Sequence, residues 1–379
     1  MQQITIYREP GRYAGWPANY GIWAWGNEIV VGFTLGYFEG GEQFHTRDKS
    51  RPFMPMQARS LDGGLTWAVA PTPCHTPGNR GLSADEHMTP DLWSLNALAA
   101  DPPAPPPGNI NFTHADFALM CGRTGLRAGS RSWFYISYDR CHSWQGPYDL
   151  PMFDQTGIAA RTDYLVDGPD SCTLLLTAAK SDGEEGRVFC ARTTDGGKSF
   201  HFVNWVTPEP KGFTIMPASV RLPISPVGSA STQPPTQAGR ILTAVRCSEI
   251  SETTQSRASW IDLYASDDNG ENWQHLIRPV PDAGRGGNPP TLTILQDGRL
   301  ALTYGYRDAP FGMRAILSHD NGQSWSDPIH LTDGAGNHDI GYPRTIQRSD
   351  STMITVYYTN DDPQGERYIA ATLWESPTT

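Results

Sequence analysis

Short hydrophobic runs recur along the whole chain, and polar segments rich in glycine and proline separate them. The runs favour β-branched and aromatic residues, which is typical of strands and not of long amphipathic helices. The pattern therefore predicts an all-β protein built from many short strands. The clearest predicted strands are residues 28–33, 132–136, 173–177, 240–245, 299–304 and 353–357.

An eight-residue pattern, Ser-x-Asp-x-Gly-x-Thr-Trp, repeats between these runs. It begins at Ser60 and returns, with substitutions, at Ser137, Thr193, Ser266 and Ser318, at intervals of 77, 56, 73 and 52 residues. Periods of this size indicate a solenoid, a propeller or an array. In a hairpin turn the Asp would accept backbone N–H bonds, the Gly would supply a positive φ, and the terminal aromatic would pack beneath the turn.

This pattern resembles the Asp-box of sialidase-like propellers, and the resemblance covers nearly the whole chain. It implies one β-propeller domain over residues 1–379, made of four-stranded antiparallel blades with each turn between the third and fourth strands. The predicted strands make up six blades. A seven-bladed ring is the alternative, because 379 residues also divide into seven blade lengths. We expect residues 3–7 to complete the last blade and close the ring. The proline-rich segments 100–107 and 225–239 are expected to be surface loops.

The composition argues against several classes of partner and cofactor. The net charge of −11 argues against nucleic acid or an anionic membrane as a partner. No apolar window is long enough for a membrane span, and Met1–Tyr7 does not resemble a signal peptide. We therefore expect a cytoplasmic protein, or a secreted one whose signal is not part of this sequence. The six cysteines lack metal-ligand spacing, so we expect no cofactor beyond a possible structural calcium and buried free thiols at Cys172 and Cys190.

The sialidase resemblance can be followed residue by residue. It implies three arginines on the substrate carboxylate, a Tyr nucleophile paired with a Glu, and an Asp acid/base. Tyr342 matches the nucleophile, and Arg246 and Arg307 match the second and third arginines. The first arginine is replaced within residues 15–19, and the segment that would carry the Glu reads Ile-Met-Pro-Ala-Ser at 215–219. These departures disfavour ordinary sialidase activity.

A second resemblance rests on residues 15–33, on His-Thr-Arg-Asp at 45–48 and on residues 58–64. These segments are similar to a sialidase-related group that releases terminal L-rhamnose from α-1,4-linked D-glucuronate on arabinogalactan. Its members are described as seven-bladed α-L-rhamnosidases or rhamnose–glucuronate lyases, and they use a histidine of the first blade. The resemblance implies an acidic oligo- or polysaccharide substrate. The alternatives are a sialidase-type exo-glycosidase with substituted catalytic residues and a non-catalytic glycan-binding propeller.

Lyase chemistry on a uronate needs a base for the C5 proton, cations for the carboxylate and an acid for the departing oxygen. Histidine is the natural base, because its pKa lies near neutrality. His45 lies in a polar, glycine-rich loop where side chains are commonly exposed, and Asp48 would orient its ring or act as an acid. Three further residues are candidate catalytic groups: His114, His338 and Tyr342.

Arginine suits carboxylate recognition, because its planar fork matches the two oxygens. The candidate substrate-binding residues are Arg47, Trp16, Asn19, Arg161, Arg221, Arg246, Arg307, Arg344 and Lys180. Of these arginines, Arg246, Arg307 and Arg344 are favoured. Arginines that do not bind substrate are expected to pair with Asp163, Asp308 or Asp339.

Overall fold

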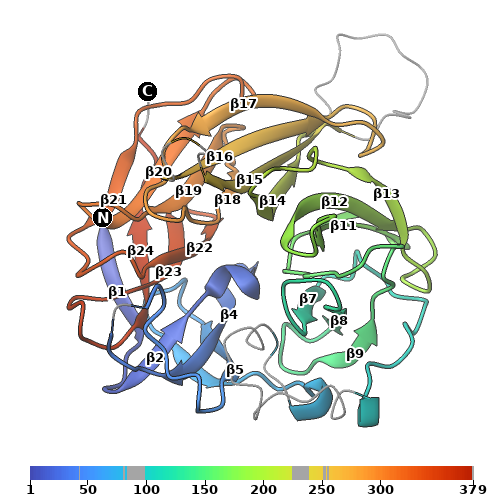
Figure 1. Ribbon diagram of the computed structural model, residues 1–379, viewed down its shortest axis with the longest axis horizontal. Helices are drawn as coiled ribbons and strands as arrows, with labels where there is room; N and C mark the ends of the chain where they lie inside the picture. The colour runs from blue at the N-terminus through green and yellow to red at the C-terminus, as the bar shows by residue number, and fades with distance from the viewer. Residues whose placement is uncertain are drawn as a thin grey trace.

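A computed structural model describes residues 1–41, 43–79, 82, 99–223, 239–250, 253 and 256–377. Six antiparallel sheets stand around a central axis like the blades of a propeller (Figure 1). The all-β, six-bladed expectation is thereby confirmed, and the seven-bladed alternative is wrong.

The first three blades lie within residues 12–205. Blade one contains β2 (Arg12–Gly15), β3 (Ile22–Trp25), β4 (Glu28–Tyr37), β5 (Met54–Ser60) and β6 (Ala68–Pro71). Among the described residues, blade two shows β7 (Ala118–Arg123), β8 (Ser132–Ser137) and β9 (Gln145–Asp149). Blade three contains β10 (Tyr164–Gly168), β11 (Ser171–Ala179), β12 (Glu185–Thr193) and β13 (His201–Trp205).

The remaining blades follow in chain order around the ring. Blade four contains β14 (Phe213–Arg221), β15 (Ile241–Ile250), β16 (Arg257–Ser266) and β17 (Gln274–Val280). Blade five contains β18 (Thr291–Ile294), β19 (Leu300–Tyr306), β20 (Gly312–Ser318) and β21 (Ile329–Asp333). Blade six contains β22 (Gly341–Gln347), β23 (Met353–Thr359), β24 (Tyr368–Trp374) and, from the other end of the chain, β1 (Gln2–Tyr7).

The pairing of β1 with β24 joins the two ends of the chain in one sheet. Gln2 lies opposite Leu373, and Thr5 lies opposite Ala370 in the antiparallel register. Figure 1 shows β1 beside the strands of the last blade. The outer strand of blade six therefore comes from the N-terminus. A separate backbone hydrogen bond, from the Ala14 N–H to the Arg367 carbonyl at 2.9 Å, joins blade one to blade six.

The repeated turns connect the third and fourth strands in blades one, three, four and five, and β8 with β9 among the described strands of blade two. In the first turn the Asp62 carboxylate accepts the Thr66 N–H at 2.9 Å and the Thr66 hydroxyl at 2.6 Å. The Trp67 indole N–H donates to the Gly64 carbonyl at 2.9 Å. The second turn places Cys141 at a φ of 64°, where the other four turns have Gly. Each turn thus satisfies its own polar groups.

The innermost strand of blade one is interrupted. Both β2 and β3 pair with β4, and the 3₁₀ turn η1 (Pro17–Asn19) separates them. Trp16 sits before this turn with a φ of 60°, a left-handed conformation that a bulky residue rarely adopts. Trp16 and Asn19, which lie within the interruption, are both buried.

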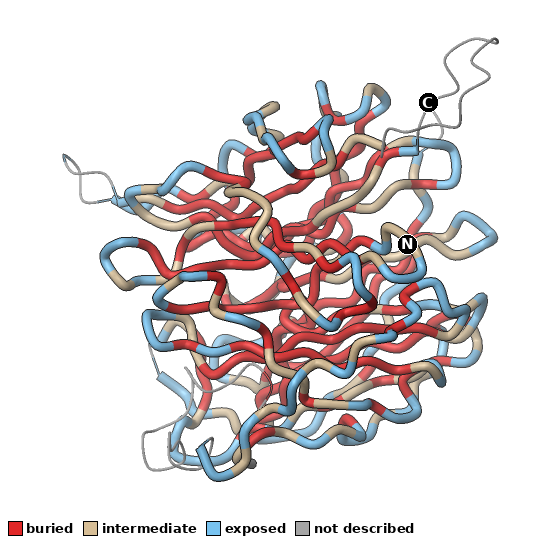
Figure 2. Tube along the Cα trace, turned by 90° about the vertical axis from the view of Figure 1, so that its right-hand side faces the viewer, coloured by how far each residue is buried: buried red, intermediate tan, exposed pale blue. Residues whose placement is uncertain are grey.

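Buried residues run through the blades, while the connections at both ends of the molecule are more exposed (Figure 2). Five of the six cysteines are buried, and all six are free thiols. The segment 100–107 lies over blade two and touches its edge through one bridge, between Ala104 and Tyr148, so it is not wholly separate from the sheet. Of the segment 225–239, only Gly239 lies within the described residues. No helix in the described ranges is long and apolar enough to cross a membrane.

Candidate functional site

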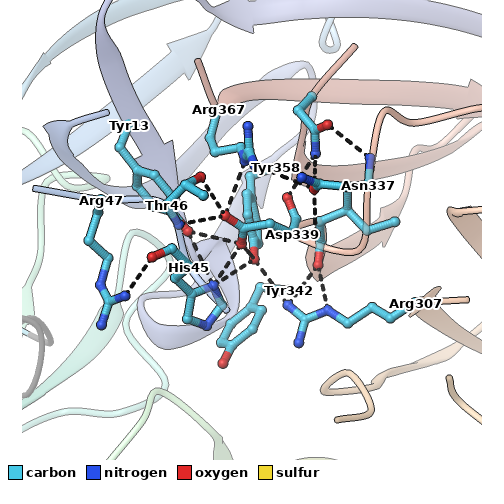
Figure 3. A network of polar contacts seen from close by, with 12 residues as sticks. Tyr13, His45, Thr46, Arg47, Arg307, Asn337, Asp339, Tyr342, Tyr358 and Arg367 are labelled. Atoms are coloured by element: carbon cyan, nitrogen blue, oxygen red, sulfur yellow. Dashed lines mark hydrogen bonds and ion pairs between the residues drawn. The ribbon is translucent and has the colours of Figure 1, made fainter. Parts of the chain in front are cut away.

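A histidine–aspartate pair joins a connection of blade one to the segment before the inner strand of blade six. His45 comes from the β4–β5 connection and Asp339 from the residues just before β22, and the His45 Nδ1 lies 2.7 Å from the Asp339 Oδ1 (Figure 3). His45 is only 9% exposed, and Asp339 is fully buried. The expectation that His45 is an exposed loop residue is wrong, because this part of the connection packs against the inner strands.

The Asp339 carboxylate accepts hydrogen bonds from several directions besides His45. Its partners are the hydroxyls of Tyr13, Tyr358 and Thr46, the Thr46 N–H and the Arg367 Nε–H. The Arg367 bond is also an ion pair, 3.1 Å long, between two side chains that are at most 1% exposed. Burial alone would raise the pKa of Asp339. The hydrogen bonds from His45 and Tyr358 and the positive charge of Arg367 instead hold this pKa well below its usual range.

The surroundings of His45 favour its neutral form. Burial lowers the pKa of His45 to about 4, the charges of Arg307 and Arg47 act in the same direction, and Asp339 opposes them. Because Asp339 is an ionised acceptor on the Nδ1 side, the network assigns the ring proton to Nδ1. The lone pair then lies on Nε2, which is the arrangement that a general base requires.

Aromatic rings fix the position of the imidazole. The edges of Trp16 and Phe44 meet the His45 ring at centroid distances of 5.3 and 4.9 Å, and the Tyr342 ring lies at 6.3 Å. Figure 3 shows Tyr342 directly beside His45. Trp16, Met216 and Tyr342 all have positive φ, and the last two lie in bulges of β14 and β22. Such bulges re-aim side chains, and here they bring residues of three blades into one packed cluster.

Two of the predicted arginines reach this cluster and differ in what they can do. Arg246 donates to the Gly286 carbonyl and to the Tyr342 hydroxyl, the latter at 3.3 Å. Arg307 is completely buried and donates to the carbonyls of Ile340 and Gly287 and to the Tyr358 hydroxyl. Arg307 therefore braces the network around Asp339. Arg246 brings a positive charge to the phenol of Tyr342.

Arg344 lies in the central channel of the propeller. Its guanidinium donates to the carbonyls of Ala18 and Thr162, each at 2.6 Å, and lines a cavity of about 320 Å³ together with Asp163. Burial raises the pKa of Asp163 to about 6, although hydrogen bonds from Ser219 and the charge of Arg344 oppose the shift. Arg344 therefore ties blades one and three together across the channel.

Three other predicted binding residues line the region between His45 and blade three. Arg47 donates to the His45 carbonyl at 2.8 Å, and its guanidinium lies over Trp16. Arg161 pairs with Glu185 at 2.5 Å and donates to the Asn19 side chain at 3.3 Å. All of these side chains except Glu185 are nine-tenths buried or more.

The remaining predicted residues make their contacts elsewhere. The Asp48 carboxylate accepts from the Ser50 N–H and hydroxyl, so Asp339 holds the place beside His45 that was predicted for Asp48. His114 lies on an exposed turn and accepts the Asp116 N–H. Arg221 pairs with Asp167, and Lys180 pairs with Asp182.

His338 lies at the edge of the site. Its ring packs on Phe44 with centroids 5.0 Å apart, and its buried Nε2 has no hydrogen-bond partner among the described residues. Burial and the charges of Arg285 and Arg307 lower the pKa of His338.

Sequence reasoning did not assign Tyr13, Phe44, Tyr358 or Arg367 to the site, and it named Asp339 only as an arginine partner. His45 and Asp339 are 294 residues apart, so no local spacing joins them. The one feature that could have indicated this pairing was the expected closure of the ring, which brings the first and last blades together. Among the described residues, no group of three or more His, Cys, Asp or Glu side chains forms a possible metal site.

No protein-family model matches the chain, and no curated protein matches its sequence. Solved structures do match its fold. A protein of unknown function from Dyadobacter fermentans DSM 18053 is 19% identical with a TM-score of 0.67, over 99% of this chain and 98% of that one. The NanB sialidase of Streptococcus pneumoniae, in its K499G form, is 10% identical with a TM-score of 0.60. The match covers 94% of this chain and 68% of the sialidase chain.

The α-L-arabinofuranosidase Arb93A of Fusarium graminearum is 12% identical with a TM-score of 0.58, over 99% of this chain and 98% of that one. At these identities the likeness concerns the fold. The chain therefore has the propeller fold that sialidases and this arabinofuranosidase also have, and a shared fold does not determine its chemistry.

Proposed function

We propose that this protein is a carbohydrate-active enzyme that removes a terminal sugar from an acidic glycan at the His45–Asp339 centre. The observation that carries the proposal is the buried pair itself, in which Asp339 orients a neutral imidazole. Arg246 and Tyr342 stand beside it. A base, a cation and a second proton-bearing group in one place suit removal of a proton next to a carboxylate. The propeller fold of a sialidase and an arabinofuranosidase supports a carbohydrate substrate.

The specific substrate that we propose is L-rhamnose α-1,4-linked to D-glucuronate, as on arabinogalactan. In this reaction the His45 Nε2 takes the proton from C5 of the glucuronate. The C5–H electrons form the C4=C5 double bond, and the bond between C4 and the glycosidic oxygen breaks. That oxygen takes a proton and leaves with the rhamnose. The products are free rhamnose and an unsaturated uronate, so atoms and charge balance without a cofactor.

Arg246 and Tyr342 have separate roles in this proposal. A guanidinium on the uronate carboxylate stabilises the negative charge that develops when C5 loses its proton. Tyr342 is the proposed proton donor for the leaving oxygen. The Arg246 guanidinium, 3.3 Å from its hydroxyl, would stabilise the phenolate that remains. A proton exchange with water then returns His45 and Tyr342 to their starting states.

A sialidase-type hydrolase with substituted residues is the second candidate. In that mechanism Tyr342 is the nucleophile and needs an acidic partner to take its proton. The segment that would supply this partner places Met216 in the site, where its sulfur lies 3.9 Å from Arg246 Nη1. Since a thioether cannot accept that proton as a base, we favour His45 as the proton-transferring group. A glycan-binding propeller without catalysis is the third candidate.

One digestion separates the three candidates. Gum arabic would be incubated with the protein while free rhamnose and the ultraviolet absorbance of the unsaturated uronate are both measured. The proposed lyase raises both signals together, and His45→Ala removes both. A hydrolase releases sugar without the absorbance, and a binding protein releases nothing. Either of the last two results contradicts the proposed elimination.

A further inference from the structure

A second pocket lies on the rim of blade three, outside the His45 site. It has a volume of about 230 Å³ and is lined by residues of three connections and the ends of β11, β12 and β13. The side chains that matter for binding are those of Asp154, Thr156, Ser181, Arg187, Trp205 and Glu209. Pockets that hold sugars combine aromatic surface with hydrogen-bonding groups of both kinds. Here Trp205 supplies the aromatic ring, one face of which Arg187 covers, and the other side chains supply donors and acceptors.

Contacts link this pocket to the site through packed side chains. The Arg246 guanidinium lies over the Phe213 ring at 5.3 Å. Phe213 in turn packs against Gly186, where an added Cβ would come within 3.0 Å of the Phe213 Cα and 3.2 Å of the Lys180 Cδ. Lys180 lines the pocket. Phe213, Gly186 and Lys180 therefore connect Arg246 to the pocket on blade three.

The polar groups of the pocket are held in place before any ligand binds. The Arg187 guanidinium lies 3.8 Å above the Trp205 ring, and its Nε donates to the Thr207 carbonyl at 3.0 Å. The Glu209 carboxylate accepts the Ser181 N–H at 2.9 Å and the Ser181 hydroxyl. Asp154 has a φ of 58°, a conformation uncommon for a residue other than glycine. Groups fixed in this way lose little conformational freedom on binding.

The charges indicate which kind of sugar fits. Lys180 is already paired with Asp182 at 2.6 Å, so the charged groups left to meet a ligand are Arg187, Asp154 and Glu209. An acidic sugar would meet two carboxylates and one guanidinium. A neutral sugar has hydroxyls that donate to the carboxylates and accept from the guanidinium.

We infer that this pocket is a subsite for a neutral sugar of the glycan chain that carries the acidic terminal disaccharide. The inference rests on the proposed function, because it assigns the non-reacting part of the same substrate. Occupation of the subsite would hold the chain while the terminal sugar is removed at His45. Remote contacts of this kind lower KM for long substrates and leave short ones unaffected.

The first test is direct binding, which does not depend on turnover. Neutral oligosaccharides prepared from carboxyl-reduced gum arabic would be titrated calorimetrically into wild type, Arg187→Ala and Glu209→Gln. The matched control is Arg278→Ala, because Arg278 also lies over an indole, that of Trp260, on another blade. We expect wild type and Arg278→Ala to bind alike, and the two pocket variants to bind at least about tenfold more weakly. Glu209 is exposed, so its substitution does not endanger folding.

The second test separates this inference from the proposed function. KM would be measured for gum arabic and for the isolated rhamnose–glucuronate disaccharide with the same variants. Arg187→Ala should raise KM for the polymer about tenfold and leave the disaccharide unchanged. Equal binding by all variants, or no binding by wild type, overturns the subsite even if wild type digests gum arabic. Binding that depends on Arg187 without turnover overturns the proposed reaction and leaves the subsite standing.

Discussion

Replacing Asp339 by Asn should destabilise the protein more than any surface charge substitution. The change leaves the Arg367 guanidinium, which is fully buried, without its charged partner, and it turns an acceptor-only group into one that also donates. Removing one member of a buried ion pair costs about 3–5 kcal/mol. The unfolding entropy of a chain of this length is about 0.8 kcal/mol per degree, so Tm should fall by about 4–6 °C.

Thermal unfolding followed by calorimetry measures this shift, and Asp361→Asn is the matched control. Asp361 pairs with Arg8 in the same blade, but the two side chains are 58% and 40% exposed. An exposed pair contributes about 0–1 kcal/mol, so the control should shift Tm by no more than about 1 °C. If both variants melt at the same temperature, Asp339 does not hold the network together as described.

Three further outcomes follow from the same site. Burial lowers the pKa of His45 to about 4, so unfolded His45 gains a proton below about pH 6.5 while the folded one stays neutral. The free energy of unfolding should therefore fall between pH 6.5 and 4, by up to about 3 kcal/mol, and His45→Gln should lose this part of the dependence in urea titrations. Arg246→Lys keeps the charge but loses the fork, and should weaken binding of the acidic glycan by about 1.5–3 kcal/mol; equal kinetics on native and carboxyl-reduced glycans would exclude carboxylate recognition. Tyr342→Phe should lower kcat at least about a hundredfold without lowering Tm, and unchanged turnover would rule out its role as the acid.

The repeated turn made the fold predictable from the sequence. Five copies and the strand runs between them indicate six blades, with seven as the alternative, and the missing outer strand of the last blade indicates the role of residues 3–7. The interrupted inner strand of blade one was not predicted. Its signal is Pro17 directly after Trp16, because a proline there ends the pairing of β2 and starts the turn η1.

The site was less predictable, because its members meet only when the ring closes. His45 and Tyr342 were identified individually. Their orienting partner Asp339 could not be paired with His45 from spacing, and Asp48 was the nearer carboxylate along the chain. Burial also reversed the expected environment of His45, from an exposed loop to a packed one. The role of each arginine depends on the backbone carbonyls that it meets in the fold, as Arg307 meets that of Ile340. No sequence pattern predicts such contacts.

The turnover of His45→Ala shows whether His45 is the proton-transferring group. Rhamnose release and uronate absorbance on gum arabic would be compared for wild type, His45→Ala and His114→Ala, the last being an exposed histidine outside the site. Circular dichroism would confirm that each variant is folded. If His45 is the general base, His45→Ala lowers kcat at least about a hundredfold, while His114→Ala matches wild type. A folded His45→Ala with wild-type turnover would contradict this role, and the proton-transferring group would then have to be sought at His338 or Tyr342.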